Sequence, residues 1–172
     1  MKKQGFTLIE LMVVIVIMGI LAAVAVPKLF GMIAKSKASE VGPAAGTYIK
    51  LQDAYVSESN KVGSWKLIGY VAPGSTSAAS EGSTTNFAYT AGTDLASNGS
   101  TLDIEGASGV GTAGKVTWQA KNRVALNECA VLDANKWTLT TKAASNGNSV
   151  TYTASVTDAC LQLTPTFEKI GQ

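Results

Sequence analysis

The pattern of apolar and polar residues divides the chain into two unequal parts. An apolar run occupies residues 6–26, and its polar side chains are Thr7 and Glu10. A helix of about 21 residues is ~31 Å long, which matches the hydrocarbon core of a bilayer. The run therefore predicts a membrane-length N-terminal helix that carries a carboxylate near its start.

After Pro27 the apolar positions recur at helical spacing. Leu29, Phe30 and Ile33 form a first stripe. Gly42-Pro43 is a breaker, which predicts a kink or a new helix with Pro43 at its first position. A second stripe consists of Val41, Ala45, Tyr48, Gln52 and Tyr55. This stripe should face a sheet, and a cluster of Ser, Asn and Gly at residues 57–63 should end the helix.

Beyond this cluster the apolar period shortens toward two, which is typical of strands. Short strands are predicted at residues 65–71, 87–89, 102–104, 116–120, 137–139 and 150–156. The last two flank Asn146-Gly147-Asn148, a hairpin signal. The Ser- and Gly-rich residues 73–85 and 106–114 indicate a loop and a turn. We expect an α+β fold in which a long kinked helix packs on an antiparallel sheet of about four strands.

The carboxylate of Glu10 needs an explanation. A charge at the bilayer centre costs about 2.5–3.5 kcal/mol even on the mildest insertion scale, so acids within membrane helices are functional by default. Glu10 lies near one end of the run, where the cost is smaller, but it still calls for a partner. Lys2 and Lys3 precede the run and place the N-terminus in the cytoplasm. Pro27 lacks an N–H, which predicts a kink or a loosened stretch between Gly19 and Pro27.

Two other interpretations of the N-terminus are open at this point. Ala23-Val24-Ala25 fits an A-x-A cleavage site, so the run could be a secretory signal peptide that releases a carbohydrate-binding module. The run could also be a plain single-pass anchor. Neither interpretation explains Glu10, because a signal peptide or a plain anchor has no use for an acid near the start of its apolar run.

The hexapeptide GFTLIE at residues 5–10 narrows the choice. Together with the short basic leader before it and the apolar run ending Ala-Val-Pro27, it resembles the N-terminal segment of type IV pilins and type II secretion pseudopilins. The resemblance implies cleavage by a prepilin peptidase between Gly5 and Phe6. It also implies N-methylation of the new Phe6 amine by the same enzyme.

The resemblance further implies three segments and a change of location. Residues 1–5 are then the leader peptide, residues 6–27 the hydrophobic transmembrane and assembly helix, and residues 28–172 the amphipathic helix and sheet of a globular pilin domain. The processed subunit waits in the inner membrane with its N-terminus in the cytoplasm. The pilus assembly machinery, with its ATPase, then draws it into a helical filament of identical subunits.

Phe6, Thr7 and Glu10 are the residues that the resemblance assigns to assembly. Cleavage creates a cation, the Phe6 amine, four residues before Glu10. In a filament the Glu10 carboxylate of one subunit can pair with the Phe6 amine of its neighbour, and removing one partner of a buried pair is strongly destabilising. We expect this pair to set the register between subunits. Gly19 and Pro27 mark the stretch that can unwind in filaments of the family.

Composition and charge exclude several function classes. The chain contains no histidine, which removes Ser-His-Asp catalysis, HExxH zinc proteases and His-ligated metal sites. Formal net charge is +2, and loss of Lys2 and Lys3 with a leader leaves 12 basic and 12 acidic side chains. That balance argues against nucleic acid as a partner, because nucleic-acid binding needs a clustered basic face. We expect no enzyme activity, no cofactor and no metal.

The two cysteines are Cys129 and Cys160. In a reducing cytosol they would be buried thiols, whereas in an exported chain they indicate a single disulfide. A bridge closing roughly 30 residues stabilises by about 3.5 kcal/mol in the chain-entropy treatment. The pair resembles the C-terminal disulfide of many type IV pilins, which major pseudopilins usually lack, and this favours a pilus subunit over a secretion pseudopilin.

A glycine-rich stretch at residues 109–115 matches both GxGxxG and GxxxxGK. Both nucleotide-binding patterns need a glycine turn that leads into a helix. Here a strand pattern follows, and Val116 replaces the hydroxyl that would bind magnesium. A hairpin loop is the better interpretation.

Two further patterns have structural explanations. Asp133 is the nearest approach to a calcium loop, but no D-x-[DN]-x-[DN]-G spacing exists, so turn chemistry explains it equally well. Trp65, Trp118 and Trp137 could form a platform for polysaccharide. Trp118 and Trp137 have the inward phase of their strands, which favours core packing.

The sequence thus predicts a structural subunit of a type IV pilus, a surface fibre for adhesion or motility with a possible extracellular ligand. A pseudopilin of type II secretion is the alternative, and a secreted carbohydrate-binding module is the third hypothesis. The N-terminus of the mature protein separates them, because the pilin hypotheses require N-methyl-Phe6 and the third requires a start at Val26.

Overall fold

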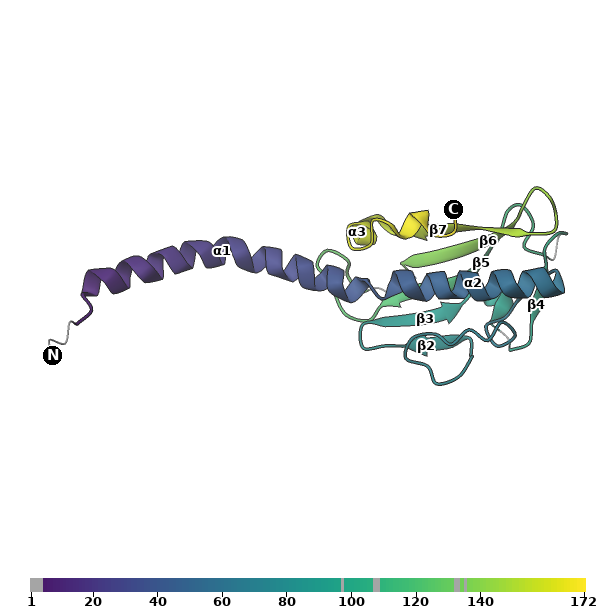
Figure 1. The fold of residues 1–172 in the computed structure, drawn as a ribbon, viewed down its shortest axis with the longest axis horizontal. Coiled ribbons are helices and arrows are strands. Elements are labelled where there is room, and N and C mark those ends of the chain that lie inside the picture. The colour runs from purple at the N-terminus through teal and green to yellow at the C-terminus, as the bar shows by residue number, and fades with distance from the viewer. Residues whose placement is uncertain (1–4, 97, 107–108, 132–133, 135) are drawn as a thin grey trace.

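The computed structural model describes residues 5–172 except residues 97, 107–108, 132–133 and 135. Helix α1, Leu8–Ala38, leaves the rest of the molecule as a single curved rod (Figure 1). It is long and apolar enough to cross a membrane. α1 is helical without interruption through Pro27, and every residue from 5 to 30 is exposed.

A short turn at Ser39–Glu40 separates α1 from helix α2, Val41–Ser59. The break therefore precedes the Gly42-Pro43 pair by two residues. Pro43 lies in the first turn of α2, where its missing N–H would have had no helical acceptor. Asn60 ends α2 in the left-handed conformation with φ 53°, a geometry that asparagine tolerates better than most residues. The predicted end of the helix is confirmed.

The sheet has five antiparallel strands in the order β2-β3-β5-β6-β7. Its strands are β2 Glu81–Ser83, β3 Phe87–Ala91, β5 Lys115–Asn122, β6 Trp137–Ala143 and β7 Val150–Val156. A separate two-stranded ribbon pairs β1, Lys61–Gly63, with β4, Thr101–Asp103. The α+β fold and its antiparallel sheet are confirmed, and the sheet is one strand larger than expected.

Two local predictions were wrong. Residues 65–71 form a turn instead of a strand, and Trp65 and Tyr70 within it are buried and pack edge-to-face at 4.8 Å. The apolar residues of this segment serve core packing and do not form a strand. Strand β2 lies inside the expected loop 73–85, and it escaped notice because Glu81–Ser83 contains no β-branched or aromatic residue. Its register comes from pairing with β3.

The connection at residues 106–114 also differs from expectation. It joins β4 to β5, which belong to different sheets, so it is a crossover and not a hairpin loop. The hairpin predicted around Asn146–Gly147–Asn148 is confirmed, because β6 and β7 pair from Ala143↔Val150 to Trp137↔Val156.

The core lies between α2 and the sheet (Figure 1). Trp65, Trp118 and Trp137 are fully buried, which confirms the core interpretation of the last two. Trp118 Nε1 donates to Tyr70 Oη at 3.0 Å, and Tyr70 Oη donates to the Ala44 carbonyl at 3.1 Å. Burial raises the pKa of Tyr70 to about 12. We call α2, the two sheets and the short elements around them the head, and the exposed part of α1 the stem. The short elements are α3 (Asp158–Leu161), η1 (Thr93–Leu95) and η2 (Phe167–Lys169).

Candidate assembly site on the N-terminal helix

Glu10 is engaged in a capping box at the start of α1. The Thr7 hydroxyl donates to Glu10 Oε2 at 2.6 Å, and the Thr7 N–H donates to the same oxygen at 2.8 Å. In return the Glu10 N–H donates to Thr7 Oγ1 at 3.4 Å. The carboxylate therefore satisfies a backbone donor at the positive end of the helix dipole. The spacing Thr-x-x-Glu is the signature of this box, so the sequence held the signal that the prediction missed.

The geometry of Glu10 leaves part of its carboxylate available. Among the residues that the structure describes, its hydrogen bonds go to Thr7 and involve Oε2. Oε1 can accept from a further donor such as an ammonium group. Because Phe6 is 83% exposed and Glu10 is exposed as well, this site is an open surface.

Gly5 and Phe6 lie directly before the helix cap, outside any helix or strand. Both residues are exposed, and an added Cβ at Gly5 meets nothing within 4 Å. Their cleavage and the methylation of Phe6 stay predictions. Lys2 and Lys3 lie outside the described residues.

The three predicted kink residues do not lie together. Gly19 and Pro27 are within the continuous α1, and Pro43 is in the first turn of α2. Figure 1 shows α1 as curved along its length. Kinking at these positions therefore stays a prediction.

A carboxylate that the sequence analysis missed holds the junction between the helices. Glu40 Oε1 accepts hydrogen bonds from Thr84 Oγ1 at 2.6 Å and from Tyr89 Oη at 2.9 Å. Arg123 Nη1 donates to the Thr84 carbonyl at 2.8 Å. Burial, and then the Glu40 carboxylate, raise the pKa of Tyr89 far above its usual value. These contacts bind the point where α1 ends to strands β2 and β3. No periodicity marks Glu40, because its partners are more than 40 residues away.

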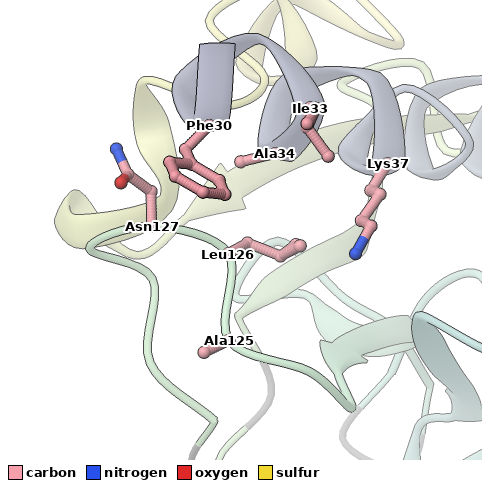
Figure 2. Close-up of a pocket in the computed structure, with 7 residues that line it drawn as sticks. All are labelled: Phe30, Ile33, Ala34, Lys37, Ala125, Leu126 and Asn127. Atoms are coloured by element: carbon pink, nitrogen blue, oxygen red, sulfur yellow. The ribbon is translucent and has the colours of Figure 1, made fainter. Parts of the chain in front are cut away.

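The disulfide between Cys129 and Cys160 is confirmed, with the two Cα atoms 4.9 Å apart. It ties the loop after β5 to α3. Asn122 Nδ2 holds the same loop by donating to the carbonyls of Val124, Cys129 and Ala130 at 2.9, 3.0 and 3.3 Å. The disulfide therefore holds the loop that lies beside α1. Figure 2 shows three residues of this loop, Ala125, Leu126 and Asn127, next to the helix.

The other candidate motifs do not form a site. The glycine-rich residues 109–114 lead straight into β5, so no helix N-terminus is present there for a phosphate. Asp133 lies outside the described residues. Within the part of the chain that is described, no group of three His, Cys, Asp or Glu could hold a metal ion.

An exposed apolar helix thus projects from a closed α+β head (Figure 1). The family model for the prokaryotic N-terminal methylation motif matches residues 1–26. The type IV major fimbrial protein FimA of Dichelobacter nodosus is 32% identical over 147 residues, which cover 82% of this chain and 84% of FimA. The chain therefore belongs to the type IV pilin family and is a structural subunit of a type IV pilus.

Two further relatives match a shorter part of the chain. The type IV major pilin protein PilA of Myxococcus xanthus (strain DK1622) is 42% identical over 60 residues, which cover 35% of this chain and 27% of PilA. The fimbrial protein EcpC of Eikenella corrodens is 54% identical over 44 residues, 26% of this chain and 29% of EcpC. No solved structure matches the chain significantly. These relatives do not favour the pseudopilin alternative.

Proposed function

We propose that this chain is the repeating subunit of a pilus fibre and that α1 is the element through which the subunits assemble. The observation that carries the proposal is the exposure of α1. Its large apolar side chains from Leu8 to Phe30 are each at least 46% exposed. A soluble monomer rarely leaves so large a contiguous apolar surface uncovered. A bilayer before assembly and neighbouring subunits after assembly would cover it.

Processing would remove residues 1–5 and leave the hydrophobic helix 6–27 and the pilin domain 28–172. A prepilin peptidase would cut between Gly5 and Phe6 and methylate the Phe6 amine. Gly5 and Phe6 are exposed and lie before the helix cap, outside any helix or strand, which supports the assignment. The match of residues 1–26 to the methylation motif supports it as well.

Glu10 would then act in two successive states. In the membrane-resident subunit it caps its own helix through Thr7. In the fibre its carboxylate would accept the Phe6 ammonium of a neighbour and so set the axial register of the subunits. Such a pair requires a dry surrounding to be selective, and packed apolar helices provide it.

The subunit would reside in the inner membrane with its N-terminus in the cytoplasm and would enter an extracellular fibre when the pilus machinery extracts it. Its role would be mechanical, without a reaction or a cofactor. Adhesion or motility would follow from contacts of the assembled heads with an extracellular surface.

Mass spectrometry of the N-terminal peptide from isolated fibres tests this function. We expect the mature chain to begin with N-methyl-Phe6, and Gly5→Val to leave the leader attached and prevent fibres. Gly31→Ala is the matched control, because an added Cβ there meets nothing within 4 Å. A mature chain that begins at Val26 would contradict the proposal.

A further inference from the structure

The C-terminal end of α1 carries three lysines, and the nearest acid along the chain is Glu40, whose carboxylate is engaged by the head. Between Glu10 and Glu40 the sequence contains no Asp or Glu. Lys28, Lys35 and Lys37 lie in this interval, and all three are exposed. Neither of the two ion pairs found in the described residues involves them. This end of α1 therefore presents three cations that the subunit itself does not neutralise.

The helix rise places these cations at a particular depth. The apolar surface of α1 extends beyond the predicted span 6–27 as far as Phe30, with Lys28 as the exception. A bilayer can therefore also hold the segment of about 20 residues from Leu11 to Phe30, which spans ~30 Å, with residues 6–10 at the cytoplasmic boundary. Glu10 then lies at the cytoplasmic boundary, where its charge is inexpensive. Lys35 and Lys37 lie roughly 8–10 Å beyond the opposite boundary, in reach of the lipid headgroups, and Lys28 can extend its side chain outward to the same level.

A groove opens at that level between α1 and the disulfide-bound loop. Figure 2 shows its walls, which consist of Phe30, Ile33, Ala34 and Lys37 from α1 and Ala125, Leu126 and Asn127 from the loop. Its volume is about 250 Å³. A groove of this size, with the Lys37 ammonium on its rim, has room for a phosphate headgroup.

Contacts within the subunit hold the loop that forms one wall of this groove. Leu126 is buried and forms an isolated β-bridge with Cys129. The Asn122 amide and the disulfide hold the same loop. Asn127 adopts a left-handed conformation with φ 58°, which is uncommon for residues other than glycine. Phe30, 62% exposed, forms the apolar wall on the membrane side.

We propose that this groove and the three lysines bind anionic phospholipids of the leaflet that faces the head. Lys37 contacts a lipid phosphate in the groove, Lys28 and Lys35 contact further headgroups on the other side of α1, and Phe30 packs on the first methylenes of the acyl chain. The inference rests on the membrane-resident stage of the proposed function. Glu128, exposed next to Asn127, opposes the binding and limits its strength.

Lipid retention by the full chain tests the proposal. The protein is reconstituted in vesicles of equal parts phosphatidylcholine and phosphatidylglycerol and extracted in mild detergent, and its co-purifying lipids are counted by mass spectrometry. We expect phosphatidylglycerol to outnumber phosphatidylcholine among the retained lipids, and Lys28→Gln/Lys35→Gln/Lys37→Gln to bring their ratio back to about one. Lys50→Gln/Lys66→Gln/Lys142→Gln removes the same charge from the head and should retain the enrichment.

The outcomes separate this inference from the proposed function. A wild-type chain that resists carbonate extraction but shows no enrichment overturns the lipid site alone, and so does an equal loss in the control triple variant. If the lysine variant keeps the lipids but fails to form fibres, the lysines contact a second copy of the chain, and the lipid proposal is wrong. If the wild-type chain leaves membranes in carbonate, the membrane stage itself fails. Glu128→Gln should raise the enrichment.

Discussion

The outer helix α1 and the inner helix α2 have consecutive sequences but opposite surroundings. Leu21 on α1 is 64% exposed, whereas Tyr48 on α2 is fully buried against Trp65 and Tyr70. α2 is stabilised by the sheet that covers it. The side chains of α1 from Leu8 to Leu29 have no such cover within the described chain. We therefore expect their burial to stabilise membrane insertion and assembly and not the folded monomer. We therefore expect packing within the head to determine the stability of the monomer, and the stem to determine how subunits assemble.

The junction between the two regions is built from polar contacts. Glu40 holds the end of α1 on β2 and β3 through Thr84 and Tyr89. On the other side, the loop tied by Cys129–Cys160 lies against α1 at Ala34. The end of α1 is therefore held on the head by the Glu40 hydrogen bonds on one side and by packing against the disulfide-bound loop on the other.

Replacing Glu10 should have the largest effect on fibre assembly. We expect Glu10→Val to be processed normally and to reduce fibre yield by about tenfold or more, because the neighbour's Phe6 ammonium loses its partner in a dry interface. The midpoint of thermal unfolding of the head should not change. Electron microscopy of sheared fibres and circular dichroism measure the two effects. Glu58→Val, an exposed acid on α2, is the control, and equal fibre loss in both variants would refute a specific role for Glu10.

Loss of the disulfide should affect the head without altering the stem. Closure of the 31-residue separation between Cys129 and Cys160 stabilises by about 3.5 kcal/mol in the chain-entropy treatment. Cys129→Ser/Cys160→Ser should lower the free energy of unfolding by about that amount in a denaturant titration. Reduction of the wild type should reproduce the shift. An unchanged unfolding midpoint under reducing conditions would show that the bridge has no structural role.

The Glu40 contact should have a smaller effect. Glu40→Ala removes the acceptor of the Tyr89 hydroxyl and the nearer of the two acceptors of the Thr84 hydroxyl. Loss of a hydrogen bond to a charged group typically costs about 1.5–3 kcal/mol. A double-mutant cycle with Tyr89→Phe measures the part that passes through Tyr89. We expect a favourable coupling energy between Glu40 and Tyr89, and strictly additive effects would contradict the contact.

The smallest effect is the response of the head to alkaline pH. Burial raises the pKa of Tyr70 from its usual 10.0 to about 12 in the folded chain. The unfolded chain therefore loses this proton first, so the stability that Tyr70 contributes is fully present below pH 10 and falls as the pH rises toward 12. The unfolding free energy, measured against pH, should decline over this window, and Tyr70→Phe should make the decline shallower. An unchanged slope in Tyr70→Phe would contradict the assignment.

The sequence predicted those features that depend on neighbouring residues. The membrane-length run, the helix end near Asn60 and the β6–β7 hairpin were confirmed. The disulfide was also confirmed, although its cysteines are 31 residues apart, because the chain contains two cysteines and leaves one possible pairing. β2 was missed because its residues have no strand preference, and its pairing with β3 comes from residues beyond it. The Glu40 contacts were missed because their partners, Thr84 and Tyr89, are more than 40 residues away along the chain. The capping box of Thr7 and Glu10 is local and was within reach of the sequence.

A matched pair of leucine truncations tests most directly whether the head stabilises the monomer and the stem only its assembly. Leu139 is fully buried in the sheet, whereas Leu21 is 64% exposed on α1. In the full chain in detergent, Leu139→Ala should lower the free energy of unfolding of the head by about 2–5 kcal/mol. Leu21→Ala should leave it unchanged and reduce fibre yield instead. A comparable loss of head stability in Leu21→Ala would contradict the account.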